Sequence, residues 1–189
     1  MSVVIAIKQK DKIYVGCDTQ VSSGNGYKGQ LKGPNQKIWH HNDLPNLVMG
    51  GVGSLRDIQI IQTCKDVIDP LAILTKGVDF SYLVNNFFSN VYTTLLEKNR
   101  VPLNEHGHPA STIESAFLVA IDDKMFIIDQ DGSVMEGEDY LVIGSGASVA
   151  TGVLETNKNK KAKDRILEAI QACSDNTLYV NEHVILTST

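Results

Sequence analysis

The order of the apolar segments restricts the fold of this chain more than any other feature, because strand-like segments follow one another and helix-like segments come in pairs. Short β-branched runs at residues 3–7 and 13–17 flank a charged stretch at 9–12, which predicts a β-hairpin. Two more strands are expected at about 36–39 and 47–49, the second running into the glycine-rich residues 50–53. Four strands are therefore expected before the first helix.

The apolar spacing of amphipathic helices recurs in four later segments. The first follows Ser54, which with Asp57 resembles a capping box, and the second places Phe87 and Val91 on one apolar stripe. The expected helices span residues 55–67, 80–95, 147–157 and 162–176. The remaining strands are expected at residues 116–121, 125–128, 140–143 and 184–186.

This order of elements predicts the class of fold. Strands that follow strands pair in antiparallel sheets through hairpins, whereas parallel strands need a crossover connection between them. The sequence therefore predicts an α+β fold in which helical layers cover antiparallel sheets. Because 189 residues fit one domain and no repeat or linker interrupts them, a single domain over residues 1–189 is expected.

Charge and cysteine usage narrow the class of function. The chain has 17 Lys+Arg and 22 Asp+Glu, a net charge of −5, so bulk charge attracts neither nucleic acid nor an anionic membrane. The first apolar run is too short for a membrane span or a signal peptide. Cys17, Cys64 and Cys173 are widely spaced, form no C-x-x-C pair and are expected as core thiols. We expect a cytoplasmic protein that binds neither nucleic acid nor membrane.

Metal and nucleotide sites have no signature in the sequence. The histidine clusters, His40-His41 and His106-Gly107-His108, have no Cys or carboxylate at ligand spacing, so we expect them in exposed loops. The G-x-S-x-G, Walker A, H-E-x-x-H and G-x-G-x-x-G patterns are absent. No metal and no cofactor are therefore expected.

The position of Ser2 allows it to act as a nucleophile, although a small residue after the initiator methionine usually has no catalytic role. Removal of Met1 would free an α-amine with a pKa of about 8. Such an amine can act as general base for the hydroxyl of its own residue. The strand expected at 3–7 would hold Ser2 rigidly.

Further candidates follow the expected strands. Asp18 ends the second strand and Lys37 begins the third; an exposed pair of this kind contributes less than about 1 kcal/mol, but a buried one could stabilise an alkoxide. The glycine-rich run 50–53 precedes a capped helix, so it is a tight turn, a source of oxyanion-binding amides, or both. Ser145, between two glycines, is by itself typical of an N-cap.

Several short motifs stand together in the order of one peptidase family. They are Ser2-Val-Val-Ile-Ala-Ile, Val15-Gly-Cys-Asp18, Gln36-Lys37-Ile38, Val48-Met-Gly-Gly-Val-Gly-Ser54, Ile128-Asp-Gln-Asp-Gly-Ser-Val134 and Ile143-Gly-Ser-Gly146 followed by Thr151-Gly-Val-Leu-Glu155. On these motifs the chain resembles, over nearly its whole length, the proteasome β-subunit superfamily of N-terminal nucleophile peptidases, which includes HslV. The resemblance implies a four-layer αββα sandwich of two antiparallel sheets.

The resemblance also implies catalytic roles for four side chains. Ser2 would be the nucleophile, where the family usually has Thr. Lys37 would be the lysine beside it, and Asp18 would orient that lysine. Ser145 would bond to the terminal amine.

Backbone groups complete the site that the resemblance implies. Gly50 would supply the oxyanion amide, with Gly51 as the alternative because the loop allows a shift of one residue. Ser22 would pair its backbone with an extended substrate.

The chain departs from the family pattern at three places. A longer segment before the lysine makes Lys32 the alternative catalytic lysine. Asp175 matches an aspartate that supports the nucleophile in many proteasome subunits, but Thr177 or Val180 falls where a serine is wanted. We expect no propeptide before Ser2, so the site is expected to depend on removal of Met1.

The predicted function is a self-compartmentalised peptidase that degrades unfolded polypeptides inside a homo-oligomeric ring. The family also implies an ATP-driven unfoldase as partner. Two other functions stay open: a proteasome-like ring subunit that has lost catalysis, and an N-terminal nucleophile amidohydrolase that acts on a small amide.

Overall fold

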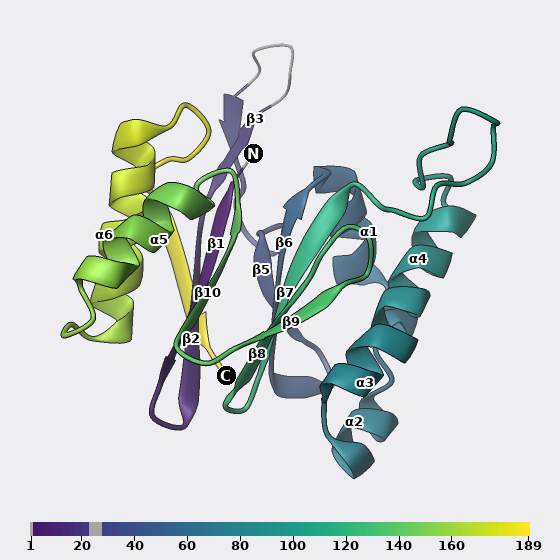
Figure 1. Ribbon diagram of the computed structural model, residues 1–189, viewed down its shortest axis with the longest axis horizontal. Helices are drawn as coiled ribbons and strands as arrows, with labels where there is room; N and C mark the ends of the chain where they lie inside the picture. Colours follow the sequence, from purple (N-terminus) through teal and green to yellow (C-terminus); the bar gives the residue numbers. More distant parts are fainter. Residues whose placement is uncertain (1, 23–27) are drawn as a thin grey trace.

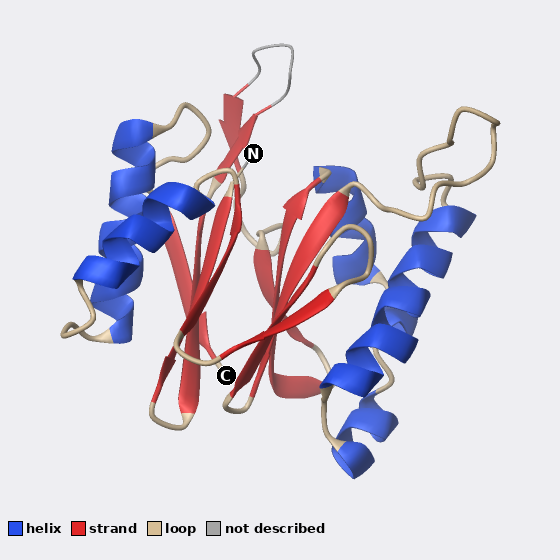
Figure 2. Ribbon diagram, viewed as in Figure 1, coloured by secondary structure: helices blue, strands red, loops and turns tan. Residues whose placement is uncertain are grey.

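Two antiparallel sheets lie face to face, and helices cover the outer face of each (Figure 1). The computed structural model describes residues 2–22 and 28–189. Helices α5 and α6 pack on the first sheet and helices α1 to α4 on the second, so the layers run helix, sheet, sheet, helix (Figure 2). The α+β, four-layer αββα sandwich expected from the sequence is confirmed.

The first sheet has the strand order β10-β1-β2-β11. Its strands are β1 (Val3–Gln9), β2 (Lys12–Asp18), β10 (Tyr140–Gly144) and β11 (Val184–Ser188). Strand β1 lies between β10 and β2, with Val3 opposite Gly144 and Val4 opposite Cys17. The first residues of the chain are therefore held on both sides by the backbone of other strands.

The second sheet has the strand order β5-β6-β7-β8-β9. Its strands are β5 (Ile38–His41), β6 (Leu44–Gly53), β7 (Ser115–Ile121), β8 (Lys124–Ile128) and β9 (Val134–Gly137). A separate hairpin of β3 (Gln20–Ser22) and β4 (Lys28–Gln30) extends beyond the sandwich at the end where the chain begins (Figure 1).

Helices form in all four expected segments, although the first ends at Thr63 and not at residue 67. They are α1 (Leu55–Thr63), α2 (Pro70–Lys76), α3 (Phe80–Tyr82), α4 (Phe88–Glu97), α5 (Ala147–Thr156) and α6 (Ala162–Asn176). A π-helical turn, Leu83–Phe87, joins α3 to α4, and Ser54 caps α1 by accepting from the amide of Asp57. No helix among the described residues combines the length and the apolar character needed to cross a membrane.

Three apolar clusters fill the three spaces between the layers. Strand β1 contributes to two of them, because alternate side chains of a strand point to opposite faces. Val4 and Ala6 pack between the two sheets, whereas Val3, Ile5 and Ile7 pack against α5 and α6. This double burial explains why the run at residues 3–7 is continuously apolar.

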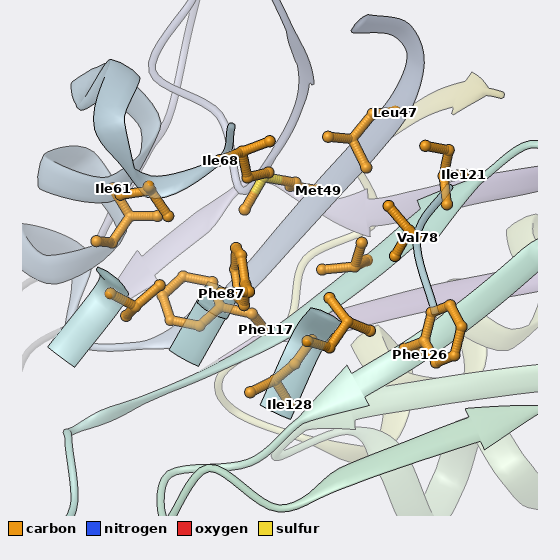
Figure 3. Packing of buried hydrophobic residues seen from close by; sticks show 14 of the residues in the cluster. Leu47, Met49, Ile61, Ile68, Val78, Phe87, Phe117, Ile121, Phe126 and Ile128 are labelled. Carbon is orange, nitrogen blue, oxygen red and sulfur yellow. The ribbon is translucent and has the colours of Figure 1, made fainter. Parts of the chain in front are cut away.

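The third cluster lies between the second sheet and its helices. Figure 3 shows Phe87 of the π-helical turn beside Phe117 of β7, and their rings meet edge to face with centroids 6.3 Å apart. Both side chains are fully buried. Helices α1 and α4 are thereby fixed on the sheet that carries the glycine-rich run.

Some elements differ from the sequence prediction. Strands β3, β4 and β9 and helix α2 were not expected, because their residues show little apolar periodicity and their pairing or packing depends on the rest of the fold. His40 and His41 lie on strand β5 and not in a loop, although His40 is exposed as expected. His106 and His108 do lie in an exposed loop, and Cys17 and Cys173 are buried.

Candidate active site

Ser2 lies immediately before β1 and is held by the junction between β10 and α5. Its backbone nitrogen donates to Ser145 Oγ at 3.2 Å, and its carbonyl oxygen accepts from the Gly146 amide at 3.3 Å. Ser145 Oγ also donates to that carbonyl oxygen at 3.4 Å. Only 7% of Ser2 is exposed. Met1, whose removal is expected, lies outside the described residues.

Gly144 makes this junction possible. Its φ of +104° lies in the region that favours glycine, and a Cβ there would lie 2.2 Å from the carbonyl oxygen of Ser2. A side chain at position 144 would therefore displace Ser2. The chain needs glycine here because β10 passes so close to the start of β1.

Asp18, at the end of β2, is the central acceptor of the site. Its Oδ1 accepts from Lys37 Nζ at 2.7 Å and from the Val3 amide at 3.0 Å. Its Oδ2 accepts from the Gln20 amide at 3.0 Å. One carboxylate thus connects the lysine, the first strand and the start of the β3–β4 hairpin.

The pair of Lys37 and Asp18 is buried, with 3% and 0% of the respective side chains exposed. Burial lowers the pKa of Lys37 from its usual value, and the adjacent Asp18 carboxylate opposes that shift. Burial raises the pKa of the neighbouring Cys17 thiol to about 12. Buried ion pairs gain little net stability after desolvation, so this pair is better explained by placement of a charge than by folding. Lys32, the alternative lysine, is exposed.

The amides of the glycine-rich run alternate in direction along β6. The Gly51 amide donates to the carbonyl of Lys37 at 2.9 Å, and the Ser54 amide donates to the carbonyl of Glu114 at 3.3 Å. Because successive amides of a strand point to opposite sides, the Gly50 amide points with that of Ser54 toward β7. This direction favours Gly51 over Gly50 as the source of an oxyanion amide.

Gly51 and Gly53 share the edge of β6 that faces Lys37. Strand β5 begins at Ile38, so the edge of β6 near Gly53 extends past it. Gly53 is exposed, has a φ of +109°, and a Cβ there would lie 2.2 Å from the carbonyl of Glu114. The sequence prediction did not single out Gly53, although a glycine before a capped helix is a signal of such a conformation.

A cleft of about 70 Å³ opens between the end of β6 and strand β3. Its walls come from both ends of the predicted site and from helix α1. They are Ser2, Gln20, Val21, Ser22, Lys37, Gly53, Leu55 and Ile58. The cleft therefore contains Ser2, Lys37 and Ser22 together. Ser145 bonds to the backbone of Ser2, and Asp18 bonds to Lys37 and to the amide of Val3, the residue after Ser2. Larger cavities of 270 to 630 Å³ are lined by none of the predicted site residues.

The segment after α6 supports the site from a direction that the sequence did not predict. Asn181 Oδ1 accepts from the amide of Thr19 at 3.1 Å, and the carbonyl of Leu178 accepts from Gln20 Nε2 at 2.9 Å. Asp175 is exposed and accepts from Gln171 Nε2 on its own helix. The contacts that hold the corner after Asp18 thus come from Asn181 and Leu178.

Metal-binding side chains do not gather near this cleft. Within residues 2–22 and 28–189, no three His, Cys, Asp or Glu side chains are placed to hold an ion together. What the cleft does contain is a hydroxyl, a buried ammonium with its carboxylate, and backbone amides. This set is suited to nucleophilic attack on a carbonyl group.

Comparison with known proteins identifies the family of the chain. The family model described as proteasome subunit matches residues 2–187. A proteasome subunit beta of Nanoarchaeum equitans is 27% identical over 159 residues, which cover 84% of this chain and 75% of that protein.

Solved structures show the same fold at low sequence identity. Eukaryotic HslV from Trypanosoma brucei is 17% identical, with a TM-score of 0.68 and 98% of both chains covered. BPH of Thiobacillus denitrificans, solved in complex with epoxomicin, is 16% identical, with a TM-score of 0.73 and 99% of this chain and 97% of that chain covered. These matches show the fold, and the family model over residues 2–187 shows that the chain belongs to the proteasome subunit family.

Proposed function

We propose that this protein is an N-terminal nucleophile peptidase in which Ser2 attacks the peptide bond. The observation that carries the proposal is the buried pair of Lys37 and Asp18. Lys37 lines the cleft that contains Ser2, and Asp18 holds Lys37 and the Val3 amide. Burial of Lys37, whose pKa is lowered, costs free energy of folding. A catalytic role explains this cost, because Lys37 lines the same cleft as the Ser2 hydroxyl.

The reaction begins once Met1 has been removed. The α-amine of Ser2 takes the proton from Ser2 Oγ, and Oγ forms a bond to the carbonyl carbon of the substrate. When the C–N bond of the peptide breaks, the departing nitrogen takes that proton and leaves as a new N-terminus. A water molecule then gives one proton to the same amine and attacks the ester. The amine passes that proton to Oγ, which restores the hydroxyl, and the acyl peptide leaves as a carboxylic acid that loses its remaining proton to water.

Each supporting group has a separate task in this reaction. The ammonium of Lys37 stabilises the negative charge that develops on Oγ, and Asp18 holds Lys37 and the Val3 amide on one carboxylate oxygen. Ser145 orients the nitrogen that serves as base. The Gly51 amide, on the edge of β6 that faces Lys37 and two residues before the cleft-lining Gly53, donates to the oxyanion in exchange for its bond to the Lys37 carbonyl.

Extended polypeptide is the substrate that the cleft walls favour. The β3 strand ending at Ser22 and the β6 edge at Gly53 both line the cleft, so a peptide can pair its backbone with two strand edges. Assembly into a closed homo-oligomeric ring with an ATP-driven unfoldase follows from the family and belongs to the same proposal.

Hydrolysis by a matched pair of serine variants tests the proposal. Ser2→Ala removes the nucleophile, whereas Ser111→Ala removes a hydroxyl from an exposed loop before β7. We expect Ser2→Ala to reduce cleavage of unfolded casein at least about 10³-fold and Ser111→Ala to match the unchanged protein. An unchanged protein that forms a ring and cleaves nothing would instead support a ring subunit without catalysis.

A further inference from the structure

We infer that the cleft beside Ser2 selects a small, uncharged aliphatic side chain on the acyl side of the cleaved bond. This inference rests on the proposed function, since it takes Ser2 Oγ as the attacking atom. The acyl side is the relevant one because that half of the substrate stays bonded to Ser2 while the other half leaves. Three properties of the cleft carry the inference: its volume, its walls and its charge.

The volume excludes large side chains. The cleft encloses about 70 Å³. An apolar cavity of roughly 150 Å³ is known to hold a benzene ring. A space of half that size accommodates a methyl or isopropyl group and leaves no room for an aromatic ring.

The wall formed by helix α1 is held in place by packing against β6 and by an ion pair at the start of the helix. Ile58 is 3% exposed, and its Cγ1 lies only 2.9 Å from where a Cβ on Gly51 would be, so the helix already packs directly on β6. The helix is also anchored at its start, because Asp57 accepts from Arg100 Nε at 2.8 Å. Leu55, on the first turn of α1, completes this wall.

The charge of the cleft excludes ionised side chains. Among the described lining residues, Lys37 carries the one ionisable side chain, and Asp18 already pairs with it at 2.7 Å. The amide group of Gln20, which also lines the cleft, is engaged with the carbonyl of Leu178. A glutamate or arginine of the substrate would therefore lose its water without gaining a counter-charge, which is strongly unfavourable.

A series of fluorogenic peptides that differ only in the residue before the cleaved bond tests the inference. The residues compared are Ala, Val, Leu, Phe, Glu and Arg. We expect kcat/KM for the Ala and Val peptides to exceed that for the Phe, Glu and Arg peptides by at least ~10-fold, the scale on which a pocket discriminates by size.

Variants of the wall give a second, independent readout. Leu55→Ala enlarges the cleft at a partly exposed position, so the fold should be retained. Ile58→Ala would instead leave a cavity at a buried position and destabilise the fold. We expect Leu55→Ala to raise the ratio of Leu-peptide to Ala-peptide cleavage at least ~5-fold. Leu96→Ala, which truncates a partly exposed leucine on α4, should leave that ratio unchanged.

The outcomes separate this inference from the function on which it rests. Cleavage that needs Ser2 but prefers Phe, Glu or Arg, or a ratio that Leu55→Ala does not move, overturns the inference and leaves the peptidase intact. No cleavage of any peptide, together with no covalent labelling of Ser2 by epoxomicin, overturns both.

Discussion

Asp18 shows how much of the site depends on a single side chain. Its two oxygens accept from the Lys37 ammonium and from the amides of Val3 and Gln20, so it joins the first strand and the Lys37 segment to the corner after β2. The sequence indicated Asp18 and Lys37 through motifs, but burial of the pair is a property of the folded chain. Removing one partner of a buried pair lowers the free energy of unfolding by about 3–5 kcal/mol, since the other charge is left unpaired.

The choice between the two candidate lysines can be tested directly. Lys37→Ala should reduce peptide hydrolysis by at least about 10³-fold, because the alkoxide loses its only buried cation among the lining residues. Lys32→Ala should change activity by no more than about twofold, as expected for an exposed position. Steady-state kinetics of both variants is the measurement, and the reverse pattern would identify Lys32 as the catalytic lysine.

The pH dependence of kcat/KM should be bell-shaped. Activity should rise as the α-amine of Ser2 loses its proton, at about pH 8. It should fall again when Lys37 deprotonates, below the usual lysine pKa because burial lowers that value. Asp18→Asn removes the carboxylate that opposes this lowering, so the alkaline limb should move to lower pH. An alkaline limb that stays in place in Asp18→Asn would show that it reports another group.

At the scale of elements, the junction between β10 and α5 positions the nucleophile. Gly144→Ala adds a Cβ that would lie 2.2 Å from the carbonyl oxygen of Ser2 if nothing moved. We expect activity to fall by about 10²-fold, the cost of a misplacement of roughly 1 Å. Kinetics and thermal unfolding of the variant, measured together, separate this effect from simple unfolding.

Gly152, within α5, provides the matched control. A Cβ at that position meets nothing within 4 Å. Gly152→Ala should therefore keep full activity and stabilise the helix by about 0.5–1 kcal/mol. Equal losses of activity in Gly144→Ala and Gly152→Ala would contradict the role assigned to the junction.

The elements that the sequence predicted are those with local signals. Strands β1 and β2 are β-branched runs, and the helix at 80–97 carries a continuous apolar stripe. The β3–β4 hairpin has no such pattern and is tied to the fold by long-range bonds such as that of Asn181 to the Thr19 amide. The direction of the Gly50 amide could not be predicted from the sequence either, because it depends on the register of β6 with β5 and β7. Local spacing does not encode either property.

At the scale of the whole molecule, several large apolar side chains remain exposed on the helical layer over the second sheet. Leu71 and Leu74 of α2 are 70% and 73% exposed, and Phe80 at the start of α3 is 54% exposed. Large apolar side chains exposed to this degree are unfavourable for an isolated subunit where they lie together. It is consistent with burial between copies of the chain.

Sedimentation velocity tests the proposed ring. The protein at micromolar concentration should sediment as a closed oligomer several times the chain mass of 20.7 kDa. A monomer that is active on short peptides would contradict self-compartmentalisation and would favour an amidohydrolase that acts on a small amide.

Intact mass spectrometry of the protein, before and after reaction with epoxomicin, tests the central claim that Ser2 is an N-terminal nucleophile. The account predicts a chain that lacks Met1 and gains one inhibitor mass, with the modified residue at Ser2 and no adduct on Ser2→Ala or on Lys37→Ala within the same time. A chain that retains Met1, or that lacks Met1 and takes up no inhibitor at Ser2, would contradict it.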